Sequence, residues 1–280
     1  MNDAYRHCEA LVRAADKDRF LAALFAPADR RGALYALYAF NVEIARVRDA
    51  IREPMAGEIR LQWWRDVLNG ERAGEGAANP VAAALLDTIA RFALPTGPLL
   101  GLIDAHAFDL YDDPIATFDV LVGYLRQTSG TVFDLAASIC GGSAERVSER
   151  AAVPYGIVAL LRAFARHASR RQLFVPVMFL DGGTTPEQIF AGRSVPAIAD
   201  VLRLMRAIAR RHFEVFEAEL AHVPAVVMPA LLPVALVPGY LAAMEREDYD
   251  PFTSAVEVPQ WRRQWTLWRA ARRYGRVMRG

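Results

Sequence analysis

The stretch RGALYALYAFNVEIARVRD, residues 31–49, decides the fold class. Its apolar residues recur at spacings of three and four, which is the period of a helix with an apolar face. Asp29 precedes the stretch as a candidate N-cap, and Glu53-Pro54 ends the run. The sequence therefore predicts a helix that is apolar in its first half and turns polar from Glu43 onward, as the solvated end of a core helix does.

Helical periodicity continues along the chain, punctuated by Gly, Pro and capping residues. We expect helices over residues 58–69, 80–94, 97–112, 117–140, 143–169, 196–221 and 257–279, with Asn79, Thr117 and Ser143 at helix starts. Residues 70–79 are small, polar and glycine-rich, which is typical of a loop, and residues 176–186 are expected to be irregular. No stretch alternates like a strand and no linker divides the chain. The sequence predicts one all-α domain over residues 1–280, with about ten helices.

Composition narrows the class of protein. The chain has 280 residues, 54% of them hydrophobic and 23% charged, so a large core is expected and disorder is excluded. A net charge of +1 argues against a nucleic-acid partner. Lys17 is the single lysine among 33 basic residues, a bias that reflects either coding composition or arginines that bind phosphate or carboxylate. Cys8 and Cys140 are too few and too far apart for a disulfide framework or a zinc site, which favours a reducing, cytoplasmic location, and residues 1–15 lack the apolar core of a secretory signal.

Residues 220–244 carry no charged residue except His222. Their length is enough to cross a bilayer. However, Pro224, Pro229, Pro233 and Pro238 interrupt the segment, and each removes a backbone donor. We predict a buried, broken hairpin of helices here, with a membrane-spanning helix as the alternative.

Three clusters of polar or aromatic residues are candidate sites. Residues 160–176 concentrate the cations Arg162, Arg166, His167, Arg170 and Arg171, which form either a solvated face or a site for an anion or an acidic partner. Residues 58–68 contain the pair Trp63-Trp64, either packed at the core and its rim or guarding a ligand cavity. Aspartates 104, 109, 112 and 113 lie near His106, and we favour a helix end and turn over a metal site.

The last predicted helix has three sectors, of which the third, with Leu267, Ala270, Ala271, Tyr274 and Val277, lies opposite the other two. Trp261, Trp265 and Trp268 fall on one stripe, with Arg269 and Arg273 in a band beside it. Tryptophan next to arginine on one helix is typical of contact with a membrane interface or with a protein partner. The alternative is that the tryptophans pack on the domain itself.

Several of these segments together resemble the squalene/phytoene synthase family of head-to-head prenyl synthases. The resemblance is colinear from about residue 16 to residue 176 and is carried by residues 31–40, 102–110, 116–119, 124–132, 161–162 and 173–176. It implies an isoprenoid-synthase-like helical bundle around a central cavity. In the family, two Asp-rich motifs on facing helices bind Mg²⁺, which grips the diphosphate leaving groups of two prenyl substrates.

This sequence departs from the family at the metal-binding positions. They fall on Ala45, Asp49, Ala163 and His167, so one of four carboxylates remains. The family's amide positions fall on Gly156 and Ala159, and its N-terminal serine element falls on residues 17–20. We therefore expect no metal, no cofactor and no catalytic residue. The expected ligand-binding residues are Tyr38, Arg46, Asp49, Asp109, Tyr124, Arg162, His167, Arg170 and Arg171.

Residues 53–66 are similar to a subgroup that contains the mitochondrial complex I assembly factor and its bacterial relatives. That resemblance implies a non-catalytic role in maturing the respiratory NADH:quinone oxidoreductase. The expected partners are an isoprenoid or lipid ligand, a complex I subunit and a peripheral contact with the inner membrane. The alternative is an active farnesyl or geranylgeranyl diphosphate transferase, which would use Mg²⁺ or hold diphosphate with arginines instead.

Overall fold

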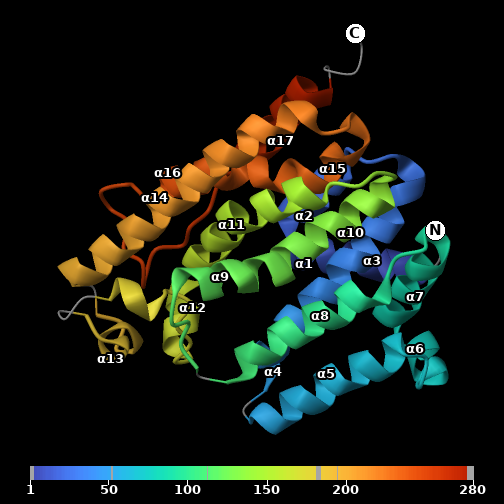
Figure 1. Cartoon of the computed structure of the whole chain (residues 1–280), viewed down its shortest axis with the longest axis horizontal. Coiled ribbons are helices and arrows are strands. Elements are labelled where there is room, and N and C mark those ends of the chain that lie inside the picture. The colour runs from blue at the N-terminus through green and yellow to red at the C-terminus, as the bar shows by residue number, and fades with distance from the viewer. Residues whose placement is uncertain (1–2, 52, 112, 181–183, 194, 276–280) are drawn as a thin grey trace.

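The computed structural model describes residues 3–51, 53–111, 113–180, 184–193 and 195–275, and within them helices alone form the regular structure (Figure 1). The first half of the chain contains α1 (Asp3–Ala15), α2 (Lys17–Ala23), α3 (Ala28–Ala45), α4 (Val47–Ala50), α5 (Pro54–Leu68), α6 (Ala73–Ala78), α7 (Pro80–Phe92), α8 (Thr96–Ala107), η1 (Phe108–Leu110), α9 (Phe118–Leu125), η2 (Arg126–Gly130) and α10 (Thr131–Cys140). The second half contains α11 (Glu145–Arg162), α12 (Phe164–Ser169), η3 (Val177–Phe179), α13 (Pro186–Phe190), α14 (Pro196–Glu219), η4 (Leu220–His222), η5 (Ala225–Val227), α15 (Met228–Leu231), η6 (Leu232–Leu236), α16 (Val237–Ala243) and α17 (Gln260–Gly275). The predicted all-α fold class is confirmed.

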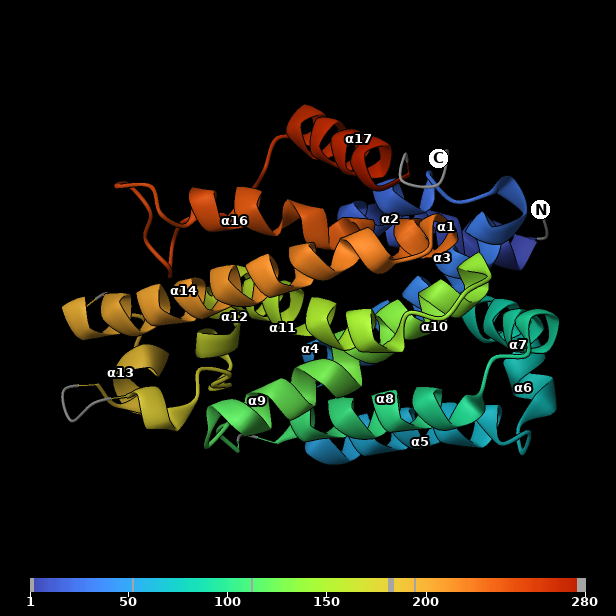
Figure 2. The same ribbon diagram turned by 45° about the horizontal axis from the view of Figure 1, so that its top comes forward.

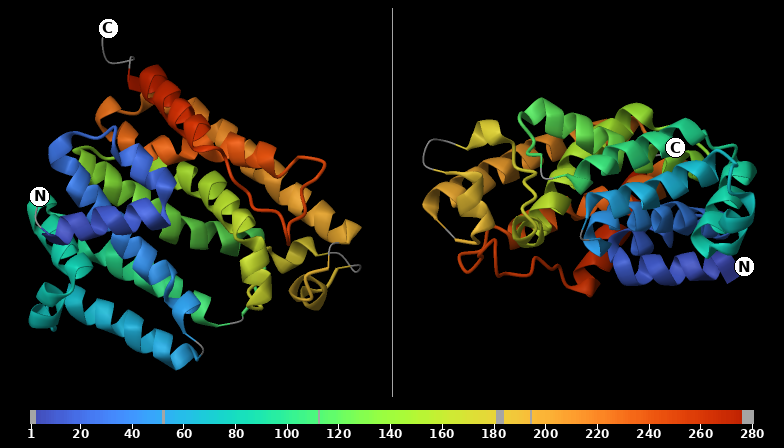
Figure 3. Two further views of the ribbon diagram at one scale, coloured as in Figure 1. Left: turned by 180° about the vertical axis from the view of Figure 1, so that it is seen from behind. Right: turned by 90° about the horizontal axis from the view of Figure 1, so that it is seen from below.

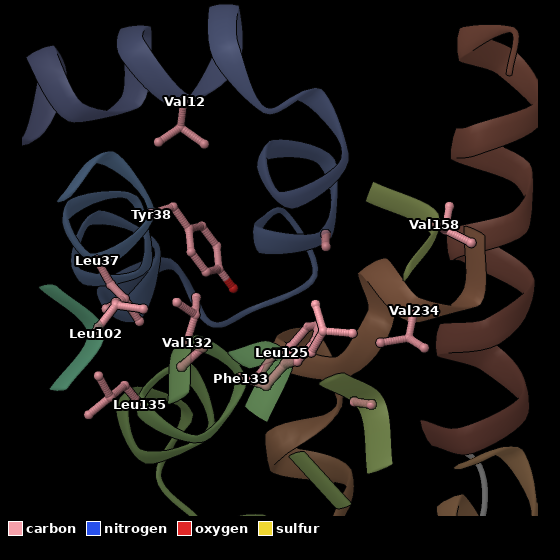
Figure 4. Close-up of a cluster of buried hydrophobic side chains, with 14 of the residues drawn as sticks. Val12, Leu37, Tyr38, Leu102, Leu125, Val132, Phe133, Leu135, Val158 and Val234 are labelled. Atoms are coloured by element: carbon pink, nitrogen blue, oxygen red, sulfur yellow. The ribbon is translucent and has the colours of Figure 1, made fainter. Parts of the chain in front are cut away.

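Helix α3 forms the centre of the bundle and is packed by α1, α7 and α10. Residues 33–40 are buried without a break, so α3 is enclosed on all sides there rather than on one face. Figure 4 shows the Tyr38 ring lying among buried aliphatic side chains that include Val12 and Val132. The predicted N-cap was wrong: Pro27 occupies that position, and Asp29 lies in the first turn, where its charge still complements the helix dipole.

Two local predictions for residues 70–80 had different outcomes. Asn79 is the N-cap of α7, as predicted, and its Oδ1 accepts the N–H groups of Val81 and Ala82 at 2.9 and 3.0 Å. The predicted loop over residues 70–79 was wrong, because α6 forms there. Packing of α6 on α5 and α7, with Gly76 close to Val67, outweighs the weak helix propensity of its two glycines.

The helix expected over residues 117–140 is continuous but changes pitch in the middle. Thr117 caps α9 as predicted, its Oγ1 accepting the Val120 N–H at 3.3 Å. A π-helical segment, η2, then joins α9 to α10, and such segments occur often at functional sites. The helix expected over residues 143–169 begins after Ala144 instead of at Ser143, and it breaks at Ala163 into α11 and α12.

The proline-rich segment runs in one direction and does not form the predicted hairpin. Residues Ala225–Ala243 make a single helical stretch, and within the described residues it is the one that is long and apolar enough to cross a membrane. Its most apolar window is 67% buried inside the protein, so the predicted burial is confirmed. Pro229, Pro233 and Pro238 each lie at the first or second position of a short helical segment, where a missing backbone donor costs nothing.

The remaining helices surround this core. Helix α14 packs along α11, and α5 packs along α8. Helix α17 lies along the outside of the bundle against η6, at the opposite edge from α5 (Figures 2 and 3). The helix predicted over residues 257–279 is described as far as Gly275, and residues 276–279 lie outside the described residues.

Candidate functional site

A cavity of about 650 Å³ lies where α2, the end of α3, α4, η2, α11 and α12 meet. All four family metal positions line it, namely Ala45, Asp49, Ala163 and His167. These positions form two pairs, each at a junction between helices. Ala45 and Asp49 lie where α3 breaks into α4, and Ala163 and His167 lie where α11 breaks into α12. The fold therefore brings these positions together as the resemblance implies.

Asp49 is the one carboxylate left at these positions, and it is engaged by cations. Arg170 forms an ion pair with its Oδ1, and Arg166 Nη1 lies 3.8 Å from its Oδ2. Both arginines come from α12 or its C-terminal end, which faces α4 across the cavity. A metal ion would have to displace these cations to reach the carboxylate.

His167 is the other polar residue at the four family metal positions, and its imidazole carries no charge at neutral pH. Burial lowers the pKa of its imidazole to about 3, with a smaller contribution from the Arg166 guanidinium. Its ring packs on Phe174 with 4.7 Å between ring centroids. The side chain therefore behaves as a partly buried neutral aromatic group.

The residues at this site do not fit a magnesium cluster. Mg²⁺ requires hard oxygen ligands in octahedral geometry. Alanine at positions 45 and 163 supplies no ligand, His167 supplies nitrogen, and Asp49 is ion-paired. Nowhere in the described part of the chain do three His, Cys, Asp or Glu residues group closely enough to hold a metal ion.

Gly156 marks a further departure from the family pattern. It stands where the family has an amide side chain, and a Cβ built there would lie 2.4 Å from Leu125 Cδ2. The space that an amide would need is filled by Leu125, which also lines the cavity. This wall of the cavity is therefore more apolar than the resemblance implies.

Basic side chains outnumber acidic ones around the cavity. The cations are Lys17, Arg19, Arg46, Arg48, Arg162, Arg166 and Arg263, and the carboxylates are Asp16, Asp18, Asp49, Asp109 and Glu257. Arg46 and Lys17 make no ion pair with a carboxylate of the described residues. The site as a whole therefore favours an anion over a cation.

The sequence analysis missed Asp18 as a centre of the site. Its Oδ2 accepts the Tyr240 hydroxyl at 2.6 Å and lies 3.3 Å from Arg162 Nη1, and its Oδ1 lies 3.3 Å from Arg263 Nη1. The carboxylate is buried with a side-chain exposure of 6%. Through these contacts Asp18 connects α2 to α11, α16 and α17. The one sign of this role in the sequence was a charged residue within the segment that corresponds to the family's N-terminal serine element.

Arg19 is a second residue that sequence reasoning missed. The side chain is buried, and its Nη1 donates to Asn41 Oδ1 at 2.5 Å. Its guanidinium lies 5.4 Å from the centroid of the Tyr38 ring and 5.3 Å from that of Tyr155. Tyr38 does not line the cavity; it lies beneath it as part of this buried group.

A hydrogen-bonded group formed by His106, Asp109 and Tyr124 lines another part of the cavity. His106 Nδ1 lies 2.7 Å from Asp109 Oδ2, and the Tyr124 hydroxyl donates to Asp109 Oδ1 at 2.9 Å. Burial and the Asp109 carboxylate raise the pKa of Tyr124 well above its ordinary value. Asp104 instead pairs with Arg65 at 2.8 Å, so the aspartates do not converge on one point. Asp112 lies outside the described residues.

Six of the nine predicted ligand-binding residues line the cavity: Arg46, Asp49, Asp109, Tyr124, Arg162 and His167. Arg170 lies behind Asp49 as its ion-pair partner. Arg171 has a left-handed backbone (φ 58°), and its guanidinium lies 4.9 Å from the Phe190 ring centroid, away from the cavity. The binding roles of all nine residues stay predictions.

The tryptophan stripe of α17 faces solvent. Trp261, Trp265 and Trp268 are 64%, 54% and 40% exposed, so the alternative that they pack on the domain was wrong. Arg269 and Arg273 are exposed beside them. Arg263, Leu267 and Ala270, on the other side of the helix, are buried.

The fold and the site define an isoprenoid-synthase-type helical bundle in which Asp49 is the one carboxylate at the four metal-binding positions. The family model for squalene/phytoene synthases matches residues 12–269, and the chain belongs to this family.

Similar proteins fall into two groups. The rat protein named NADH dehydrogenase (ubiquinone) complex I, assembly factor 6 is 29% identical over 91% of this chain and 78% of its own length, and the human protein of that name is 27% identical over 90% and 77%. A phytoene synthase from Arthrospira platensis is 25% identical over 95% of this chain and 92% of its own length.

The solved structures agree with the fold. The crystal structure of the squalene synthase HpnC from Alicyclobacillus acidocaldarius has a TM-score of 0.75 and 26% identity, and the match covers 89% of this chain and 95% of that one. A dehydrosqualene synthase in complex with ligand also has a TM-score of 0.75, at 15% identity and 98% coverage of this chain, which shows the shared fold.

Proposed function

We propose that this protein is a non-catalytic member of the squalene/phytoene synthase family that acts in the assembly of respiratory complex I. The observation that carries the proposal is the state of the four metal positions. Two are alanine, one is a neutral histidine, and the remaining Asp49 is ion-paired with Arg170. Ionisation of a prenyl diphosphate requires several metal charges to stabilise the leaving group, and this set of side chains supplies no ligands for them.

The similarity to the complex I assembly factors supports the second half of the proposal. These mammalian proteins are matched over more than three quarters of their length. In this role the protein contacts a complex I subunit at the inner membrane, as a peripheral protein on the cytoplasmic side.

The cavity has the properties of a binding site for an amphiphilic anion. It is bounded by apolar groups such as Leu125 and Phe174 and by an excess of cations that includes Arg46 and Arg162. An isoprenoid or lipid with an acidic head group matches both features. We propose that such a molecule is a bound ligand of the assembly factor and is not turned over.

An enzymatic assay tests the first half of the proposal. The purified chain is incubated with farnesyl or geranylgeranyl diphosphate and Mg²⁺, with the Arthrospira phytoene synthase as a positive control. We expect no coupled product from this chain. Formation of a head-to-head product would contradict the proposal and support the alternative, an active prenyl diphosphate transferase.

A genetic assay tests the second half. Deletion of the gene in the organism that carries it is expected to lower the amount of assembled complex I on native gels. The Asp49→Asn variant, which removes the last metal-type carboxylate while keeping its shape, is expected to restore assembly as well as the wild-type gene does. Normal complex I in the deletion strain would refute the assembly role, and failure of a stably folded Asp49→Asn variant would indicate that the carboxylate has a functional role.

A further inference from the structure

The outer face of α17 combines exposed aromatic rings with arginines that have no acidic partner in the described part of the chain. Trp265 and Trp268 stack with 4.9 Å between ring centroids. Arg272 lies 4.7 Å from the Trp268 ring centroid, and Arg262 lies 5.2 Å from that of Trp261. We define the docking face as Trp261, Arg262, Trp265, Trp268, Arg269 and Arg272, all of which are exposed.

The helix is held firmly from its inner side, so the exposure of this face is a property of the folded protein. Arg263 donates through Nε to the Val258 carbonyl at 2.8 Å and pairs with buried Asp18. Tyr274 donates its hydroxyl to Glu217 of α14 at 2.9 Å. Leu267 is completely buried. These contacts fix which side of α17 points outward.

The charge of the face has one sign. Residues 260–275 include five arginines and no aspartate or glutamate. Arg263 and Arg273 pair with acidic residues of the bundle, whereas Arg262, Arg269 and Arg272 form no ion pair with any described residue. A partner that forms ion pairs with all three arginines must present several negative charges over the length of the helix.

An apolar pocket lies beside the face. It has a volume of about 970 Å³ and is bounded by α14, by the segment from α15 to α16 and by α17. Its walls include Phe216, Leu220 and Leu231, and Trp268 and Arg269 lie on its α17 side. Apolar volume next to unpaired cations suits a molecule with an acyl chain below a phosphate.

We propose that the docking face binds the surface of an anionic phospholipid bilayer. Tryptophan prefers the boundary between head groups and acyl chains, and arginine pairs with lipid phosphate. The pocket beside α17 provides room for an acyl chain. This inference rests on the peripheral membrane contact in the proposed function and names the surface that makes it. It does not depend on what the central cavity holds, because none of the six residues of the docking face lines that cavity.

Vesicle co-sedimentation of the full chain tests the proposal. The probes are vesicles of phosphatidylcholine alone and of phosphatidylcholine with phosphatidylglycerol at a ratio of about three to one. We expect binding to the anionic vesicles, weakened by high salt, and little binding to phosphatidylcholine alone. Replacing Arg262, Arg269 and Arg272 together by glutamine is expected to weaken binding about a hundredfold, since each cation near an anionic surface contributes about a fivefold factor.

A matched variant removes three exposed arginines elsewhere, Arg60, Arg126 and Arg211, and is expected to bind like the wild type. The triple Trp261→Ala, Trp265→Ala, Trp268→Ala variant is expected to lose at least about a tenfold factor in affinity. This variant still fluoresces through Trp63 and Trp64, which lie outside the docking face. The blue shift of tryptophan fluorescence that the wild type shows on vesicle binding is therefore expected to be absent in this variant.

Three results would overturn the proposal: no binding to either vesicle, equal binding to both, or equal weakening by the docking-face and control arginine variants. Absence of vesicle binding would assign the face to an acidic protein surface. Thermal unfolding of each variant shows whether it is folded, so unchanged vesicle affinity of a folded docking-face variant counts as the third of these results.

Discussion

Asp18→Asn is the substitution that most directly tests the connections between the cavity and the outer helices. The buried carboxylate is the only acidic partner that Arg162 and Arg263 have among the described residues, and it also accepts the Tyr240 hydroxyl. Asparagine keeps the shape and can still accept from Tyr240. It removes the negative charge and leaves the Arg263 guanidinium, whose side chain is 11% exposed, without a counter-charge.

The expected loss of stability follows from the burial of the pair. Breaking a buried ion pair by removing one partner costs about 3–5 kcal/mol, because an uncompensated charge stays behind. Arg162 has a side-chain exposure of 35%, so water compensates it in part, and we expect the lower limit, about 3 kcal/mol. For a domain of this size that corresponds to a decrease in Tm of about 5 °C.

Urea unfolding followed by circular dichroism measures the effect. Asp200→Asn is the matched control, since its ion pair with Arg203 has side-chain exposures of 63% and 68% and its removal is expected to cost under about 0.5 kcal/mol. In the double variant Asp18→Asn, Arg263→Met, part of the loss is expected to be recovered because the stranded cation is gone. If Asp18→Asn unfolds within about 1 kcal/mol of the wild type, the carboxylate does not hold these helices together.

Three further predictions concern single groups. The pKa of His167 is about 3 in the folded chain, whereas the unfolded chain takes up this proton near pH 6.5, so the free energy of unfolding falls as pH decreases. Between about pH 7 and about pH 5, the decrease measured by urea titration is expected to be about 2 kcal/mol smaller in His167→Asn than in the wild type. Equal decreases in the two proteins would show that the imidazole titrates normally. Burial raises the pKa of Cys8 to about 12 and that of Cys140 to about 11. Neither thiol is therefore expected to react with a thiol reagent at mildly alkaline pH until urea unfolds the protein. Rapid reaction of the folded chain would contradict this prediction. Gly156→Asn, which introduces the family's amide, is expected to destabilise the protein by about 1–3 kcal/mol because its Cβ would lie 2.4 Å from Leu125 Cδ2. The matched control is the double variant Gly156→Asn, Leu125→Ala, in which this clash is relieved. If the single variant is as stable as the wild type, Leu125 moves aside and the reasoning is wrong.

The sequence predicted much of the fold because its signals are local. Helical periodicity around residues 31–49 and the cap at Asn79 depend on neighbours within a few residues, and both were confirmed. The errors arose where packing between distant segments prevails. The loop expected at residues 70–79 contains helix α6 because this helix packs on α7, and the proline-rich segment is one helical stretch because the bundle buries it.

The candidate site divides in the same way. The absence of metal ligands at Ala45 and Ala163 was visible in the sequence, because an alanine has no donor atom in any fold. The ion pairing of Asp49 with Arg170 joins residues more than a hundred positions apart, so periodicity could not predict it. The same holds for Asp18 and Arg263, which are separated by 245 positions.

By itself the sequence determined the helical class, the family resemblance and the loss of the metal-binding carboxylates, since each follows from the identity of side chains at given positions. Only the tertiary structure decided that the remaining carboxylate is held by arginines, that Asp18 connects the cavity to α17, and that the tryptophans of α17 face solvent. The physical reason is that charge pairing and burial are set by groups brought close in space, and helices far apart in the chain supply those groups.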